Sequence, residues 1–353
     1  MSTSTLHPYA RSVVKVGEHG GAHRVAIRAG ISILIPFLAL LALGHVEWSI
    51  YAAFGAFTSV YGRNASRSGR FRMQAAAAVM MVSAVVLGSL VAILPGREWV
   101  AVIVASIVAV VAARVSDVFG FLPPGPLFAV FALCATASVP GTAANLPIAF
   151  AVAGASAVLA VVIGQAGRAR RTPPRLQDVR GTVTPARSAL RPAFRPLHNL
   201  RFGVAAAVAG SLSTALGIGH PYWAMVAAIV PLVASDLPNA FVRGTHRVLG
   251  TVVGLALAWL LLLLQPSGLV AILLVVGLQV AAELLVMRNY GLALVFVTPL
   301  ALLMIDLVHP GDPTQLIADR GIETLLGTVV AILIACASWL AMRRSVATTG
   351  PLA

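Results

Sequence analysis

Charged side chains are scarce in this sequence, at 10% of its 353 residues against roughly 25% in a typical soluble domain. Acidic residues are the scarcer kind, with 11 Asp and Glu against 25 Lys and Arg. The two cysteines, Cys134 and Cys336, lie in apolar stretches without metal-ligand spacing and are expected to be packing residues. The sequence has no P-loop, HExxH, GxSxG or Cys-x-x-Cys motif, so it predicts neither an enzyme nor an ATP-driven motor.

Long apolar runs dominate instead, in a chain that is 59% hydrophobic. They cover residues 29–44, 73–96, 202–219, 248–282 and 324–342. A membrane-spanning helix needs about 20 apolar residues, and these runs lack the alternation of barrel strands. The sequence therefore predicts an all-α, polytopic helical membrane protein. No cleavable signal peptide is expected before Ala26, and the first span itself is expected to direct insertion.

One stretch of the sequence occurs twice. Residues 45–69 and 220–244 share identities without a gap at an offset of 175, and the match extends a little beyond both ends. The matched pairs include His45 with His220, Trp48 with Trp223, Asn64 with Asn239, Gly69 with Gly244 and Arg72 with Arg247. Internal similarity of this length indicates two copies of one structural unit.

The apolar segments divide into two sets of six, about 12 transmembrane helices in all. The expected spans are 26–44, 47–62, 72–94, 98–114, 121–139 and 145–166, then 200–218, 221–236, 246–264, 268–286, 290–307 and 319–342. The corresponding regions are a basic N-terminal tail (1–24), a first repeat (25–166), an Arg/Pro-rich linker (167–199), a second repeat (200–342) and a C-terminal tail (343–353). The segments 47–62 and 221–236 are short for a full crossing.

The positions of the basic residues predict the orientation. With both termini in the cytoplasm, all but two of the 25 Lys and Arg fall on inner segments, and the exceptions are Arg97 and Arg320. The net charge of +14 is thus a topology signal, with attraction to anionic membrane lipids as a secondary effect, and a nucleic-acid partner is not expected. An even number of spans in each half predicts two parallel-oriented six-helix repeats.

Arginines at the inner loops suggest an anion site. Arg72, Arg243 and Arg247 would attract a carboxylate, because a guanidinium binds it with two parallel hydrogen bonds and stays charged. Asn64 and Asn239 are the expected polar partners, and Trp223 would accept an aromatic ring. The alternatives remain open that these arginines only contact lipid headgroups and that Trp223 belongs to an interfacial aromatic belt.

Acidic residues near or within the membrane are candidates for proton coupling, because burying an ionisable group there is costly. The candidates are Glu283, Glu323 and Asp236. Glu283 could instead form a local ion pair with Arg288, and Asp319, Arg320 and Glu323 could cap the start of the last span. Neither a cofactor nor a metal site is predicted. Gly327 and the Gly250-x-x-x-Gly254 pair are expected to serve helix packing.

Two segments resemble a known family. Tyr222-Trp223-Ala224, followed by RVLGTVVG at 247–254, resembles the fusaric acid resistance family of bacterial inner-membrane transporters, whose pattern is a Trp and then an Arg-x-x-Gly-Thr-x-x-Gly helix. Arg288-Asn289-Tyr290 and RGIETLLG at 320–327 are similar to later family segments. The resemblance covers about 200–342 and is weaker over 23–166, where the Gly-Thr after Arg72 is missing.

The family includes aromatic carboxylic acid exporters, and plant aluminium-activated malate channels are similar in architecture. The resemblance therefore implies efflux of small organic, often aromatic, carboxylates from a bacterial cell. Export against a gradient would have to be driven by proton influx. Two other functions remain open, a passive organic-anion channel and a non-transporting scaffold that uses the basic linker. Whether two chains associate as a homo-oligomer is left open.

Overall fold

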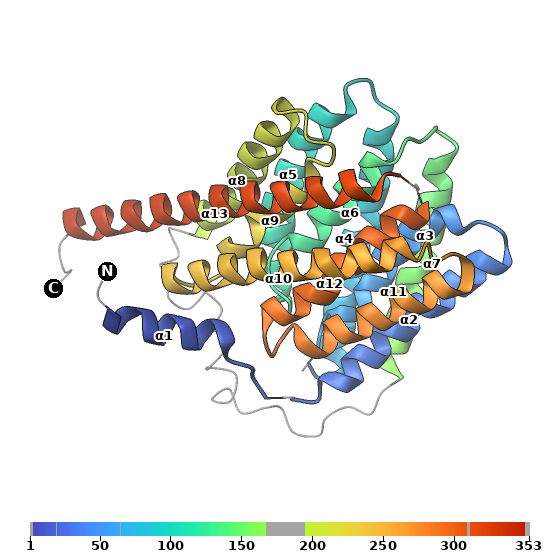
Figure 1. The fold of residues 1–353 in the computed structure, drawn as a ribbon, viewed down its shortest axis with the longest axis horizontal. Helices are drawn as coiled ribbons and strands as arrows, with labels where there is room; N and C mark the ends of the chain where they lie inside the picture. The colour runs from blue at the N-terminus through green and yellow to red at the C-terminus, as the bar shows by residue number, and fades with distance from the viewer. Residues whose placement is uncertain (1–2, 19, 64, 167–194, 309–310, 350–353) are drawn as a thin grey trace.

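The structure is a computed structural model that describes residues 3–18, 20–63, 65–166, 195–308 and 311–349. Within these ranges it is all-helical, as the sequence predicts (Figure 1). The first half holds α1 (Thr3–Val14), α2 (Ala22–Ala42), η1 (Val46–Trp48), α3 (Ser49–Ala56), η2 (Phe57–Val60), α4 (Arg67–Ala92), α5 (Arg97–Phe119), α6 (Leu127–Ser138) and α7 (Asn145–Gln165). The second holds α8 (Arg195–Ala215), α9 (Tyr222–Leu232), α10 (Leu237–Leu263), α11 (Gly268–Leu285), α12 (Tyr290–Val308) and α13 (Pro313–Thr349).

Eight helices of the described residues are long and apolar enough to cross a membrane: α2, α4, α5, α7, α10, α11, α12 and α13. Large apolar side chains on these helices face outward, among them Val79, Ile103, Phe150 and Leu333. A soluble protein does not expose so much apolar surface, whereas lipid accommodates it. Each of the twelve predicted spans coincides with helical structure, but four of these helices are not among the eight: α8, and the shorter α3, α6 and α9, which have 8, 12 and 11 residues.

The two short segments of the duplicated stretch lie at the centre of the molecule. Every residue of α3 and of α9 is buried, including Trp223 at 0% exposure. A helix that is apolar on all sides is stable only when other helices surround it. Close packing is possible because Gly55 of α3 rests against the Ala153 carbonyl of α7, and Gly327 of α13 against the Ala224 carbonyl of α9.

The two halves pack against each other in a reciprocal way. The first predicted span of each half lies along the fourth predicted span of the other, so α2 packs on α11 and α8 packs on α5. A glycine stands at each crossing, with Gly30 against Val280 and Gly203 against Ser106. Within the halves, α4 packs on α6 and α7, and α10 packs on α12 and α13. This reciprocal packing agrees with the predicted parallel repeats, which remain a prediction.

The N-terminal segment defines one end of the bundle, called here the α1 end. Helix α1 lies beside the start of α10 (Figure 1), and the chain after it crosses the junction between α11 and α12. There the Asn289 amide donates to the carbonyls of Val13 (3.0 Å) and Lys15 (3.2 Å). The Gly17 N–H donates to the Arg288 carbonyl at 2.8 Å, and the Arg288 Nε donates to the Gly17 carbonyl at 3.1 Å. The predicted basic tail thus contains a helix and is anchored to the second half. Most of the predicted linker, 167–194, lies outside the described residues.

Candidate functional site

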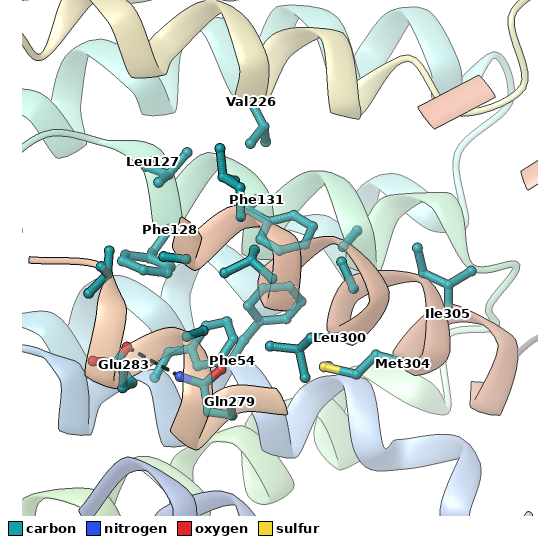
Figure 2. Close-up of a pocket in the computed structure, with 18 of the residues that line it drawn as sticks. Phe54, Leu127, Phe128, Phe131, Val226, Gln279, Glu283, Leu300, Met304 and Ile305 are labelled. Atoms are coloured by element: carbon teal, nitrogen blue, oxygen red, sulfur yellow. Dashed lines mark hydrogen bonds between the residues drawn. The ribbon is translucent and has the colours of Figure 1, made fainter. Parts of the chain in front are cut away.

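A cavity of about 120 Å³ lies between the two halves. Helices α3 and α6 line it from the first half, and α9 to α13 line it from the second. Figure 2 shows Glu283 and Gln279 toward one side of this space and Met304 and Ile305 toward the other. The lining residues are mainly apolar, and the polar ones are Arg247, Gln279, Glu283, Tyr290 and Arg320. An apolar pocket with a few converging polar groups is the usual form of a small-molecule site.

Two buried arginines carry positive charge into this cavity. Arg247 on α10 and Arg320 on α13 are each 2% exposed. The Arg247 Nη1 donates to the Tyr290 hydroxyl at 3.1 Å, but its Nε and Nη2 have no partner. The Nε and Nη1 of Arg320 also have no hydrogen-bond partner. Leaving a buried donor unsatisfied costs about 1–3 kcal/mol, and more for a charged group, so both arginines are suited to receive an anion.

Local sequence explains how α10 positions Arg247. The helix begins at Asp236, whose carboxylate accepts from the Asn239 backbone N–H at 2.8 Å. One turn after Arg247, Gly250 rests against the Gly291 carbonyl of α12. This close approach brings Arg247 next to Tyr290 at the start of α12. The predicted packing role of Gly250 and Gly254 is confirmed, since Gly254 rests against Thr298 of the same helix.

Arg320 is held by the aromatic residues that the duplicated stretch provides. Its guanidinium carbon lies 5.0 Å from the centroid of the Trp223 ring, in a cation–π contact. Trp223 in turn stacks on His220, with ring centroids 4.7 Å apart. Trp223 is therefore buried, away from any interfacial belt, and supports a cavity residue without lining the cavity itself.

An aromatic wall from the first half faces these charges. Phe54 and Phe131 meet edge to face with centroids 5.1 Å apart, and Phe57 and Phe128 do so at 5.4 Å. All four side chains line the cavity, and Figure 2 labels three of them. Edge-to-face packing holds such rings in fixed positions. The cavity thus pairs a cationic side with an aromatic side.

Glu283 lines the cavity near the α1 end and pairs with a partner that the sequence did not suggest. Its carboxylate bonds to Arg63, in the loop after η2, and accepts from the Gln279 amide at 3.3 Å. The expected alternative, a local pair with Arg288, is wrong, because Arg288 donates to the Gly17 carbonyl. The Arg63–Glu283 pair joins the two halves.

Glu323 belongs to a second polar group, at the opposite end of the bundle. It is fully buried, accepts from the Ser213 hydroxyl at 2.9 Å and has one carboxylate oxygen without a partner. Nearby, His220 lies 3.1 Å from the Asp319 carboxylate. The capping alternative for these residues is wrong, because α13 begins at Pro313, ten residues before Glu323. Arg320, three residues before Glu323, likewise lies well after the start of α13, and its side chain is buried in the bundle.

The remaining predicted site residues lie elsewhere. Arg72 is exposed on α4, and Arg243 is half-buried but does not line the cavity. Asn239 and Asp236 are exposed and bond to each other at the N-terminus of α10, where Asp236 caps the helix and Asn239 donates to the Asp236 carboxylate. Asn64 lies outside the described residues. Of the predicted set, Arg247 and Glu283 line the cavity, and Trp223 supports it through Arg320.

Sequence reasoning missed several cavity residues. The distribution of basic residues places Arg320 on an outer segment, whereas it lines the cavity. Arg63 is predicted only as an inner-loop cation, whereas it bonds to the cavity residue Glu283 without lining the cavity itself. The scarcity of acidic residues could have indicated that Glu283 pairs with an arginine from elsewhere in the chain, because each buried Glu in such a chain needs a hydrogen-bond donor nearby. The four phenylalanines carried no such signal, since aromatic residues are common in any apolar helix. Among the described residues, no group of three or more His, Cys, Asp or Glu is placed to hold a metal ion.

Comparison with known proteins gives a match over the second half. Residues 206–334 match the family model described as fusaric acid resistance protein-like. The chain is also 28% identical over 138 residues to the uncharacterized membrane protein YvaC of Bacillus subtilis (strain 168). That alignment covers 39% of this chain and 22% of the relative, so the chain aligns with about a fifth of that protein. No solved structure matches. The resemblance read from the sequence is confirmed: this membrane protein carries a fusaric acid resistance protein-like region at residues 206–334.

Proposed function

We propose that this chain transports small organic anions across a bacterial plasma membrane, and that aromatic carboxylates are its preferred substrates. The observation that carries the proposal is the pair of buried guanidinium groups, Arg247 and Arg320, whose N–H groups are unsatisfied in a cavity between the halves. Burying a charge costs several kcal/mol unless a counter-charge compensates it. A carboxylate accepts two parallel hydrogen bonds from a guanidinium group, so a small organic carboxylate is a suitable counter-ion for this pair.

The two sides of the cavity supply the two parts of the recognition. The substrate carboxylate accepts hydrogen bonds from Arg247 and Arg320. Its aromatic ring packs among Phe54, Phe128 and Phe131, where edge-to-face contacts add to the apolar burial. This explains why the cationic side chains come from one half and the aromatic ones from the other. The site is then complete only when the halves are together.

Proton coupling is assigned to Glu283 and Glu323. Glu283 is buried beside Arg63, and Glu323 is buried one turn along α13 from Arg320, so binding or losing a proton changes the local charge where the substrate anion must move. Export from the cytoplasm against a gradient needs an energy source, and in the proposed scheme proton influx through these residues provides it. Both termini and the Arg/Pro-rich linker are placed in the cytoplasm, as the distribution of basic residues favours.

The test is transport of labelled benzoate by the purified chain in proteoliposomes, with and without a pH gradient. The affinity of the Arg247→Gln and Arg320→Gln variants for benzoate is expected to be lower by about tenfold or more, since a charge-assisted hydrogen bond contributes about 1.5–3 kcal/mol. The Arg72→Gln variant, which removes the same charge from an exposed position, serves as the matched control.

The outcomes separate the candidate functions. Benzoate movement that requires a pH gradient supports the proton-linked exporter. Currents that follow the benzoate gradient alone identify a passive channel at the same site. Unchanged transport in both cavity variants would overturn the site assignment, and no movement of any aromatic or aliphatic acid by the folded protein would overturn the transport proposal.

A further inference from the structure

Three arginines of the first half come together near the α1 end of the cavity, and two of them, Arg28 and Arg63, lie close enough to Glu283 for their charges to interact with it. They are Arg28 on α2, Arg63 in the loop after η2 and Arg70 in the first turn of α4, and the charges of all three interact with one another or with Glu283. The side chain of Arg63 is 6% exposed, and Arg70 is also 6% exposed. This cluster, called here the inner arginine cluster, is distinct from the Arg247 and Arg320 pair.

The backbone around the cluster is built to hold these side chains together. Gly62 has a φ of 75°, and a Cβ there would lie 2.9 Å from the Cγ of Arg70. The loop can therefore pass directly over Arg70 only with glycine at this position, and it carries Arg63 with it. The Gln74 amide, one turn further along α4, donates to the Tyr61 carbonyl at 3.3 Å and ties the same loop down.

The charges of the cluster are not balanced within the described residues. The cluster holds three guanidinium groups and one carboxylate: Glu283 bonds to Arg63 and interacts with the charge of Arg28, whereas Arg70 interacts with the charges of Arg28 and Arg67. The Nε and Nη2 of Arg70 and the Nε of Arg28 are buried without a hydrogen-bond partner. Arg67, exposed on the same helix as Arg70, adds further positive charge instead of reducing it. An unpaired buried charge of this kind calls for a second anion.

We propose that the inner arginine cluster is a second carboxylate site, at which an incoming substrate takes the place of Glu283 on Arg63. The proposal rests on the proposed transport of organic anions and adds the step by which the substrate reaches the cavity. During the exchange the Arg63–Glu283 ion pair breaks and an Arg63–substrate ion pair forms. Glu283 keeps its bond from Gln279 and turns to Arg28. No proton has to move, because three cations accommodate two carboxylates.

The exchange has a structural consequence. The Arg63–Glu283 pair links the loop of the first half to α11 of the second half, at the side of the cavity nearest the α1 end. When the substrate replaces Glu283, this link between the halves is lost. Substrate binding at the cluster thereby opens the cavity toward the side from which the substrate arrives. An empty protein keeps the pair and stays closed on that side.

The experiment measures access to the cavity by thiol labelling. A reporter cysteine is introduced as Ala282→Cys, at a cavity-lining position beside Glu283, in a background with Cys134→Ala and Cys336→Ala. The labelling rate is measured in phosphatidylcholine nanodiscs with and without benzoate. Benzoate is expected to raise the rate about tenfold, which corresponds to loss of an ion pair worth ~1.4 kcal/mol.

Variants assign the response to the cluster. Arg63→Gln and Glu283→Gln should each be labelled rapidly without benzoate, because either change removes the pair. Arg70→Gln should abolish the response to benzoate. Arg67→Gln, which removes an equal charge three residues away at an exposed position, should respond like the parent protein. Equal responses in Arg70→Gln and Arg67→Gln would overturn the proposal, as would slow labelling of both folded pair variants.

Three further outcomes are distinguishable. If Arg63→Gln loses the accessibility response but still binds benzoate through Arg247 and Arg320, both proposals are supported. If the parent protein transports benzoate but its reporter is insensitive to it, the second site is wrong and the transport proposal stands. If the response disappears only when the nanodiscs contain phosphatidylglycerol, the cluster holds a lipid phosphate, and the assignment to substrate is overturned.

Discussion

The guanidinium of Arg320 lies over the face of the Trp223 indole, with its central carbon 5.0 Å from the ring centroid. Both side chains are almost completely inaccessible, at 2% and 0% exposure. The contact ties α13 to α9, a central helix of the duplicated stretch. The distribution of basic residues places Arg320 on an outer segment, but in the structure Arg320 lines the cavity between the halves.

Replacing Trp223 should weaken anion binding through Arg320. A buried cation–π contact contributes about 2 kcal/mol, so Trp223→Leu should weaken benzoate binding roughly tenfold or more, while Trp223→Phe, which keeps a ring, should lose less. Equilibrium binding of benzoate to the purified variants measures this, alongside thermal unfolding to confirm that each is folded. Equal affinity in a folded Trp223→Leu protein would contradict the supporting role of Trp223.

The aromatic wall should determine the preference for aromatic over aliphatic acids. Phe131→Leu removes one partner of the edge-to-face pair with Phe54, which is worth about 0.5–1.5 kcal/mol beyond the buried area. Affinity for benzoate should fall severalfold, whereas affinity for acetate should not change. The control is Phe150→Leu, at a lipid-facing position that is 62% exposed. A parallel loss for both acids would indicate a structural effect instead.

Ser213 should matter for proton coupling through Glu323. The Ser213 hydroxyl donates to the Glu323 carboxylate at 2.9 Å, and a hydrogen bond to the charged form favours that form. Glu323→Gln should leave benzoate binding in place but remove the effect of a pH gradient on transport. Ser213→Ala should change the pH dependence of transport, because the Glu323 carboxylate then loses its hydrogen-bond donor. Transport across a series of external pH values tests both, and an unchanged profile in Glu323→Gln would exclude it from coupling.

Close helix contacts should make two glycines behave very differently. A Cβ at Gly327 would collide with the Ala224 carbonyl, whereas a Cβ at Gly277 meets nothing within 4 Å. Gly327→Ala should therefore lower the thermal stability strongly. Gly277→Ala should be neutral or slightly stabilising, since alanine is favoured over glycine within a helix by about 1 kcal/mol. Thermal unfolding in one detergent compares the two, and similar losses would contradict the packing of α13 on α9.

Asp236 should act as a helix cap and not in proton coupling. Burial raises the pKa of its carboxyl, but hydrogen bonds from Asn239 and Ser235 outweigh this and hold the pKa below its ordinary value. The stabilisation is thus present at neutral pH and is lost as the pH falls through that lowered pKa. Asp236→Ala should cost about 0.5–2 kcal/mol of stability, and Asp236→Asn much less. Loss of pH-gradient-dependent transport in Asp236→Asn would restore it as a coupling candidate.

The class of the protein and its helical segments could be read from the sequence. Apolar runs such as 73–96 and 248–282 are local properties of the chain, and lipid leaves helices as the solution for such runs. The duplicated positions, the family resemblance and the packing glycines at 250 and 254 were equally accessible, because each depends on residue identity or short spacing. Arg247 and Glu283 were found because a charge is conspicuous in a chain with so few of them.

The pairing of these charges depended on the way the helices pack across the two halves. Arg63 and Glu283 are 220 positions apart, yet their side chains meet because the two halves face each other around the cavity. Arg72 and Arg247 occupy equivalent positions in the duplicated stretch, but one is exposed and the other 2% exposed. The rotation of each helix about its axis decides which arginine is buried, and that rotation is set by contacts with neighbouring helices.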